Sequence, residues 1–261
     1  MSGSVRFDRA AEFYDETRGY DAELARATTE LLTGELRGRG RVLEVGVGTG
    51  LIALPLHEAG IAMLGLDISA PMVGKLVEKA GGVPFPLVLG DATVLPFAHD
   101  VVDAGLIRWV LHLIPNWQDT VAELVRAIRP GGVLVVHLGT YGGPRDEIHR
   151  RFEEVAGFSV DPVGLGWHGE DELDAEVARH GGRLRMLPPL IHRSEEPLAA
   201  FLDGIEHNRY SWTWPVPDDV RLAALDELRP WAEERFGPLH VPRTWEAAIV
   251  WRAYDLPMSS R

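Results

Sequence analysis

The chain has 261 residues, no cysteine, and a net charge of −13 from 39 acidic and 26 basic residues. This length suits one α/β domain with insertions, and no Ser-, Gly- or Pro-rich linker divides the chain, so we expect a single domain over residues 1–261. The negative charge repels a phosphate backbone, so nucleic acid is not expected as a partner. The lack of cysteine excludes a disulfide framework, a thiolate metal site and a thiol nucleophile.

The sequence pattern also bears on location. Residues 1–20 alternate charged and aromatic side chains, and no stretch reaches 18 uncharged apolar residues, so we expect a cytoplasmic protein without a membrane segment. Lys75 and Lys79 are the only lysines beside 24 arginines (26 − 2 = 24), a bias associated with GC-rich bacterial genomes. No pattern indicates the oligomeric state.

Residues 42–50 predict a buried strand that ends in a glycine-rich turn. The apolar residues Val42, Leu43 and Val45 are typical of a strand covered on both faces of a parallel sheet. Three alternating glycines follow it and precede a helical pattern over residues 51–59: Gly46, Gly48 and Gly50. Glycines at such a turn let a flat or charged ligand approach the main chain and a helix N-terminus. The pattern therefore indicates a nucleotide-type site.

The spacing of the glycines leaves the kind of nucleotide open. The dinucleotide motif Gly-x-Gly-x-x-Gly/Ala fails from Gly46 because Leu51 occupies its last position, but a degenerate match from Gly48 survives through Ala53. A glycine-rich strand end can also be a simple tight turn. The motif therefore needs support from other segments.

Acidic side chains follow the next two predicted strands. The strand over residues 61–66 is followed by Asp67, 17 residues after Gly50 (67 − 50 = 17), where a carboxylate can bind a ribose diol. The strand over residues 85–89 is followed closely by Asp91. Each acid alone has a simpler explanation, a helix N-cap for the first and a solvated turn for the second. Together with the glycines, they favour a nucleotide site.

The rest of the chain continues an α/β pattern. Helices are expected over residues 116–128, 146–155, 171–180, 198–207 and 218–236, and strands over residues 101–107, 133–138, 183–187 and 245–254. Apart from the short helix, residues 139–169 are rich in Gly and Pro and are expected to be mostly loop.

With these motifs the chain resembles the class I S-adenosylmethionine (SAM) dependent methyltransferases, in particular the small-molecule enzymes related to those of ubiquinone and menaquinone biosynthesis. The motifs that carry the resemblance are, in chain order, Phe7–Asp15 with Arg18–Tyr20, Glu44–Gly50, Leu66–Ser69, Gly90–Ala92 with Leu95–Phe97, and Arg129–Gly132. The resemblance implies a Rossmann-like, doubly wound sheet of seven strands, mostly parallel, with the last strand as an antiparallel edge. It also implies an N-terminal cover over residues 1–30, a SAM-binding core over 31–139 and inserted lid helices over 197–237.

The resemblance implies which residues would bind SAM. Asp67 would accept hydrogen bonds from both ribose hydroxyls, Asp91 would accept one from the adenine amino group, and Ala92 would donate a backbone N–H. Ten further residues are implied at the cofactor: Tyr14, Arg18, Glu44, Gly46, Gly48, Gly50, Ile68, Met72, Ile107 and Arg108. Arg108 is unusual at its position and could instead pair with an acid such as Glu44. The product would be S-adenosylhomocysteine (SAH).

Methyl transfer from a sulfonium is a direct displacement that requires an in-line approach and a dry cavity, whereas a base is optional. His112 is the best-placed candidate base because it follows the fourth strand, although a histidine beside an apolar stretch is often structural. His168, on the Gly-rich loop, is a second candidate, and His137 is expected to be structural. The residues after strands four and five lack the carboxylates of a magnesium site, so we expect no metal.

Aromatic residues and histidines supply the candidate acceptor-binding residues Tyr20, Trp109, His112, His168, Tyr210, Trp212 and Trp214. For the last three, core packing of the inserted helices is an equally good explanation. The leading hypothesis is methyl transfer to a small, hydrophobic or aromatic acceptor in a lidded pocket. One alternative is a SAM-binding protein of the same fold that catalyses a cyclisation or elimination, and another is a nicotinamide oxidoreductase. The sequence identifies neither the acceptor nor whether oxygen, nitrogen or carbon is methylated.

Overall fold

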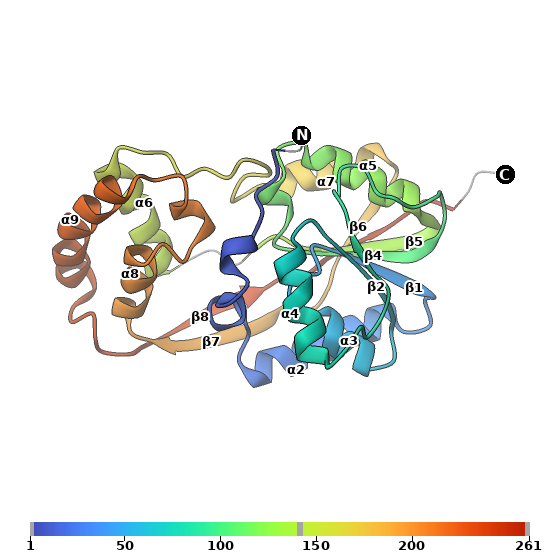
Figure 1. Cartoon of the computed structure of the whole chain (residues 1–261), viewed down its shortest axis with the longest axis horizontal. Helices are drawn as coiled ribbons and strands as arrows, with labels where there is room; N and C mark the ends of the chain where they lie inside the picture. The colour runs from blue at the N-terminus through green and yellow to red at the C-terminus, as the bar shows by residue number, and fades with distance from the viewer. Residues whose placement is uncertain (1–2, 140–142, 259–261) are drawn as a thin grey trace. The chain divides into compact units, whose positions relative to one another are not determined.

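The computed structural model describes residues 3–139 and 143–258, which form two compact units (Figure 1). Unit 1 comprises Met1–Gly139, Val163–Leu190 and Ile249–Arg261, and unit 2 comprises Thr140–Pro162 and Ile191–Ala248. Residues 1–2 of the expected N-terminal cover and residues 140–142 of the expected loop lie outside the described residues. The single-domain organisation, with its cover and lid, stays a prediction.

Unit 1 contains a seven-stranded sheet with the order β3-β2-β1-β4-β5-β9-β6. Its strands are β1 (Arg41–Val45), β2 (Ala62–Asp67), β3 (Leu87–Leu89), β4 (Val102–Arg108), β5 (Ile128–His137), β6 (Arg183–Met186) and β9 (Arg252–Asp255). The first five strands pair in parallel, and β9 runs antiparallel to both β5 and β6. The predicted α/β, doubly wound sheet with one antiparallel strand is confirmed.

The expectation for the last strand was wrong both in the extent of the strand and in its position in the sheet. The predicted strand over residues 245–254 is two strands, because β8 (Arg243–Ile249) pairs with β7 (Leu190–Glu196) in a separate two-stranded sheet and the chain re-enters the main sheet as β9. The break falls at Val250, whose carbonyl oxygen lies 3.0 Å from Nδ1 of His137, and at Trp251, whose carbonyl accepts from the N–H of Leu187 at 2.9 Å. Strand β9 also lies between β5 and β6 instead of at an edge. Apolar residues continue through the break, so the sequence pattern does not reveal it.

Helices cover both faces of the sheet in unit 1. The helices of unit 1 are α1 (Tyr14–Arg18), α2 (Ala22–Leu36), α3 (Ala53–Glu58), α4 (Ala70–Ala80), α5 (Trp117–Ala127) and α7 (Glu170–Arg179), with short 3₁₀ turns η1 (Asp8–Ala10) and η2 (Leu111–Leu113). Figure 1 shows α2 and α3 on one face and α5 and α7 on the other. Successive strand residues are buried in different clusters: Val42 packs with residues of α2 and α3, whereas Leu43 packs with residues of α5 and α7. Burial on both faces explains the unbroken apolar runs of the central strands.

Unit 2 has a hydrophobic core of its own. It contains α6 (Pro144–Ala156), α8 (Leu198–Glu206), α9 (Asp218–Phe236) and the 3₁₀ turn η3 (Ser211–Thr213). The three helices agree with those expected from the sequence, and their buried residues include Phe152, Leu202 and Leu228. Among the described residues, no helix is both long and apolar enough to cross a membrane.

Candidate functional site

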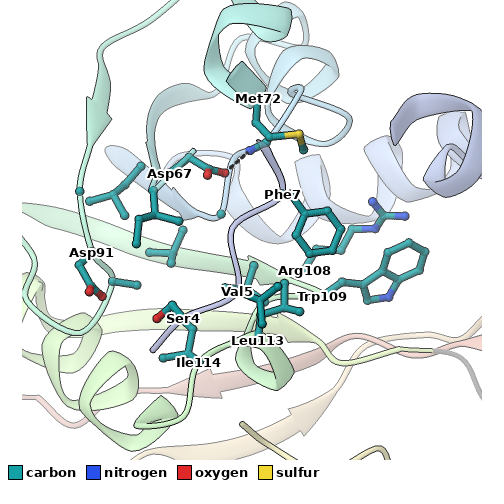
Figure 2. A pocket seen from close by; sticks show the side chains of 18 of the residues that line it. Ser4, Val5, Phe7, Asp67, Met72, Asp91, Arg108, Trp109, Leu113 and Ile114 are labelled. Atoms are coloured by element: carbon teal, nitrogen blue, oxygen red, sulfur yellow. Dashed lines mark hydrogen bonds between the residues drawn. The ribbon is translucent and has the colours of Figure 1, made fainter. Parts of the chain in front are cut away.

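One pocket of unit 1 lies at the carboxyl ends of β1, β2 and β4, under the N-terminal segment (Figure 2). Ligands of doubly wound sheets bind at this edge, where the strand order reverses between β1 and β4. Ten residues expected at the cofactor or the acceptor line it together: Tyr14, Gly46, Gly48, Asp67, Ile68, Met72, Asp91, Ala92, Arg108 and Trp109.

The glycine loop after β1 adopts a backbone that side chains would block. Gly46, Gly48 and Gly50 have φ angles of 71°, 53° and 79°, in the left-handed region that favours glycine. A Cβ at Gly46 would lie 2.2 Å from Cγ2 of Val110, and one at Gly48 would lie 3.2 Å from Cε of Met72. Gly46 and Gly48 line the pocket, whereas Gly50 packs against Leu54 of α3. The bare loop lets a ligand contact the main chain.

Asp67 ends β2 with its carboxylate held by the backbone. Its Oδ2 accepts a hydrogen bond from the N–H of Gly48, and its Oδ1 accepts one from the N–H of Ser69, both at 2.8 Å. Burial raises the pKa of Asp67, and these backbone hydrogen bonds oppose the shift. Each carboxylate oxygen has a further lone pair, so the group can also accept from two ligand hydroxyls. This arrangement suits a ribose diol.

The loop after β3 presents a second acid to the same pocket. The Oδ1 of Asp91 accepts from the backbone N–H of Thr93 at 2.9 Å and from its hydroxyl at 2.8 Å, which orients the carboxylate. Ala92, Ile68 and Met72 add apolar surface to the lining. The arrangement can hold a flat ring with a polar edge, such as adenine.

The pocket also has a mostly apolar wall whose individual residues the sequence did not predict. It is made by Ser4 and Val5 of the N-terminal segment and by Val110, Leu113 and Ile114 after β4. Figure 2 shows Ser4, Val5, Leu113 and Ile114 side by side. The N–H of Val5 donates to the carbonyl of Leu113 at 2.9 Å, which ties the two segments together. The expected N-terminal cover over residues 1–30 includes Ser4 and Val5, but small side chains carry no distinctive signal that assigns them individually to a site.

Arg108, Trp109 and Tyr20 form a compact group at the end of β4. The guanidinium carbon of Arg108 lies 4.4 Å from the ring centre of Tyr20 and 3.8 Å from that of Trp109. Its Nε donates to the hydroxyl of Tyr20 at 3.2 Å, and its Nη2 donates to the carbonyl of Arg18 at 3.0 Å. Trp109 has a φ of 56°, a conformation that is rare for a bulky residue and that occurs at functional sites. The suggested pairing of Arg108 with Glu44 is not among its hydrogen bonds.

The three histidines considered in the sequence analysis do not line the pocket. His112 packs against Trp167 with ring centres 5.4 Å apart, and desolvation of its ring, with a smaller effect of Arg18, lowers its pKa to about 4. Burial, followed by the charge of Arg108, lowers the pKa of His137 to about 4, and its Nδ1 lies 3.0 Å from the carbonyl oxygen of Val250. His168, the second candidate base, lies on the loop before α7.

The remaining expected residues are placed elsewhere. Arg18 and Tyr20 contact Arg108, whereas Glu44 and Ile107 are buried in β1 and β4 and do not line the pocket. Tyr210, Trp212 and Trp214 belong to unit 2. There the rings of Tyr210 and Trp212 stack 5.9 Å apart beside its core, while Nε1 of Trp214 donates to the carbonyl of Asn208 at 3.1 Å.

A metal site would require several acidic or histidine side chains close together. In the ranges 3–139 and 143–258, no three His, Asp or Glu side chains are grouped so that they could hold a metal ion.

Comparisons with known proteins identify the family. Residues 43–136 match a family model described as a methyltransferase domain. The chain is 34% identical over 148 residues to a phosphatidylethanolamine N-methyltransferase from Cereibacter sphaeroides, covering 53% of this chain and 68% of that protein. It is 34% identical over 138 residues to a demethylmenaquinone methyltransferase from Renibacterium salmoninarum, covering 51% of this chain and 56% of that protein.

A solved structure, that of the YcgJ protein from Bacillus subtilis, has the same fold with a TM-score of 0.60 and 18% identity, covering 90% of this chain and all of that one (100%). The chain therefore belongs to the class I SAM-dependent methyltransferases. Its cofactor is SAM, and its function is SAM-dependent methyl transfer to a small molecule. The chain spans about two thirds of the first relative and about half of the second.

Proposed function

We propose that this chain transfers the methyl group of SAM to a small hydrophobic or aromatic acceptor by direct displacement in the pocket of unit 1. The observation that carries the proposal is that the glycine loop, Asp67, Asp91 and the N-terminal segment all line one pocket. A nucleotide cofactor requires these groups together. One molecule must contact the bare backbone of the glycine loop, a carboxylate that accepts hydrogen bonds from its ribose hydroxyls, and a second carboxylate that accepts one from its adenine amino group. Those expected cofactor residues that line the pocket therefore fit SAM.

Each end of the cofactor has its own proposed partners. Asp67 accepts from the ribose hydroxyls, while Asp91 accepts from the adenine amino group and Ala92 donates its N–H to the ring. Ile68 and Met72 bury the adenine faces, and the loop at Gly46 and Gly48 passes beneath the methionine and ribose portions. When bound, SAM supplies an electrophilic methyl group, which needs no metal for transfer.

The protein itself has to exclude water and hold the acceptor in line. The N-terminal segment is well placed for the first task, since Ser4, Val5, Phe7 and Tyr14 line the pocket and the N–H of Val5 is bonded to Leu113. A dry pocket strengthens every electrostatic interaction within it, and fixed geometry removes the entropic cost of bringing the reactants together. The proposed N-terminal cover has this function.

The lid helices over residues 197–237 remain a second part of the proposal. In unit 2, Trp212 packs against His149 and Phe152, with ring centres 4.5 Å and 5.3 Å apart. These contacts support the alternative that the aromatic residues of the insertion stabilise the core of unit 2. A substitution at Trp212 separates the two roles, because a core residue affects the melting temperature and a lid residue affects the KM for the acceptor.

The test is release of SAH from SAM in the presence of a panel of acceptors, chosen from phenols, quinols, amines and phosphatidylethanolamine. We expect SAH to form only with an acceptor, and at the same rate after addition of EDTA. Conversion of an acceptor without release of SAH would instead indicate a cyclisation or elimination. Binding of NADH in preference to SAM would contradict the proposal and favour an oxidoreductase.

A further inference from the structure

Arg108 is a buried cation whose hydrogen-bonding capacity is only partly used. The residue is 6% exposed and lines the pocket. A guanidinium has five N–H donors, and the hydrogen bonds to Tyr20 and Arg18 use two, which leaves three (5 − 2 = 3) without a partner among the described residues. A buried cation in this condition is costly unless a ligand completes its shell.

No carboxylate of the described residues pairs with this guanidinium. Arg108 forms no salt bridge among them, and the hydrogen bonds to Tyr20 and Arg18 are its only ones. The nearby acid Glu44 is 3% exposed, and its Oε2 has no hydrogen-bond partner among them. Burial, partly opposed by the charge of Arg108, raises the pKa of Glu44 to about 8, so that this group is mostly protonated at neutral pH. Glu44 therefore leaves the charge of Arg108 largely uncompensated.

The orientation of Arg108 is fixed by its neighbours. The rings of Tyr20 and Trp109 both lie against the guanidinium, and the Nε and Nη2 hydrogen bonds restrict its rotation. A planar guanidinium that is held in this way is suited to bind a carboxylate, which accepts two parallel hydrogen bonds from its N–H groups. It loses little rotamer freedom on binding, because folding has already restricted its rotamers.

The charges of the cofactor indicate which kind of ligand group would complete the hydrogen bonds of Arg108. The ammonium and carboxylate of the methionine portion of SAM cancel each other, and the sulfonium adds one positive charge close to the reactive end. A guanidinium at the same end of the pocket raises the local positive charge further. An anionic group on the acceptor would offset it and would be attracted to the methyl group that it is to receive.

From these contacts we propose that Arg108 binds a carboxylate on the methyl acceptor, so that the acceptors of this enzyme are small carboxylic acids. The proposal rests on the proposed function, because it places an acceptor beside the bound cofactor. The same chemistry could serve the carboxylate of SAM itself. The experiment therefore measures the two sources separately.

The first measurement is a titration of the SAH-loaded protein with benzoate and with benzamide, which have the same shape but differ in charge. We expect benzoate to bind at least ~10-fold more tightly, since a charge-assisted hydrogen bond contributes about 1.5–3 kcal/mol. Equal binding of the two compounds, or no binding of either, would overturn the proposal. This comparison uses the unaltered protein and does not depend on the folding of a variant.

The second measurement repeats both titrations with Arg108→Met and with the matched control Arg26→Met. Arg26 lies on α2, where it pairs with Glu30 on the exposed surface. Only Arg108→Met should abolish the preference for benzoate, and it should change the Kd of SAH by less than ~3-fold. A loss of SAH affinity above ~10-fold would show that the carboxylate is the cofactor's own. Failure of the unaltered protein to bind SAH at all would instead contradict the proposed function.

Discussion

The proposed nucleoside end of the pocket, at Asp67 and Asp91, and the proposed reactive end, at Arg108 and Trp109, differ in how their polar groups are satisfied. At the nucleoside end, Asp67 accepts from two backbone N–H groups and Asp91 accepts from two donors of Thr93. At the reactive end, three N–H groups of Arg108 and Nε1 of Trp109 have no partner among the described residues. Oε2 of Glu44, which is buried behind the lining, has none among them either. The acids at the first end are already oriented by protein donors before a ligand binds, whereas several donors at the second end have no partner among the described residues.

This difference has a physical consequence for binding. A buried polar group without a partner costs about 1–3 kcal/mol, so a fold keeps such groups where a ligand or water offsets that cost. We infer that the nucleoside end is pre-organised for one cofactor, whereas the reactive end acquires its full set of contacts only with the acceptor. Substitutions at the two ends should therefore affect different measurements.

The largest effect is expected for Gly48→Val, which alters the pre-organised end. A β-branched side chain is strained at a φ of 53°, and its Cβ would lie 3.2 Å from Cε of Met72, in the space proposed for the cofactor. SAH binding, measured by calorimetry, should weaken by more than ~150-fold.

Gly74→Ala is the matched control for Gly48→Val, because Gly74 lies within α4 and a Cβ there meets nothing within 4 Å. It should leave the Kd of SAH unchanged and stabilise the fold by roughly 0.5–1 kcal/mol. Wild-type affinity in Gly48→Val would remove the glycine loop from the cofactor site.

Asp67→Ala should be the next most damaging substitution. It removes the proposed acceptor of the ribose hydroxyls and leaves the N–H groups of Gly48 and Ser69 without their carboxylate. We expect SAH to bind roughly 10- to 150-fold more weakly, from a loss of about 1.5–3 kcal/mol. An unchanged Kd in calorimetry would show that this carboxylate does not contact the ribose.

Glu44→Gln should affect the pH dependence of stability. The pKa of Glu44 is about 8 in the folded protein, whereas a glutamate in water has an ordinary value of 4.5, so folding takes up a proton between these values. Its contribution to stability is full below pH 4.5 and is lost as the pH rises toward 8, by up to about 1.4 kcal/mol per pH unit.

Thermal melts without ligand provide the measurement. At pH 5 the variant and the wild type should have similar melting temperatures, whereas at pH 8 the variant, which carries no charge at this position, should melt higher. The same difference at both pH values would mean that Glu44 does not titrate in this range and that the reactive end lacks a protonated acid.

The smallest effect is expected for His112→Ala. With a pKa near 4, the ring is neutral at pH 7 but is a weak base. We expect kcat for SAH release to fall by less than ~10-fold, with no new inflection in the pH–rate profile between about pH 6 and 8. A loss of roughly 100-fold or more would establish the base role that its position after β4 suggested.

Much of the nucleoside end could be predicted because its signals are local. An apolar run before alternating glycines specifies a buried strand and a turn with positive φ, and Asp67 and Asp91 follow their own strands closely. The reactive end could not be predicted in the same way. Arg108 was recognised as unusual, but its contacts with Arg18 and Tyr20 join residues 90 and 88 positions apart.

From the sequence alone we could predict most of the strands and helices, the glycine loop and the positions of the two acids, because periodicity and turn chemistry act over a few residues. Strand β7 and the break between β8 and β9 were not predicted. Other features became visible only in the folded chain: Ser4 and Val5 share a wall with Leu113, β9 inserts between β5 and β6, and Arg108 lacks a carboxylate partner among the described residues. These features depend on which distant segments meet when the sheet is covered on both faces. A local sequence pattern does not specify these long-range contacts, because the free energy that selects them comes from packing of the whole core.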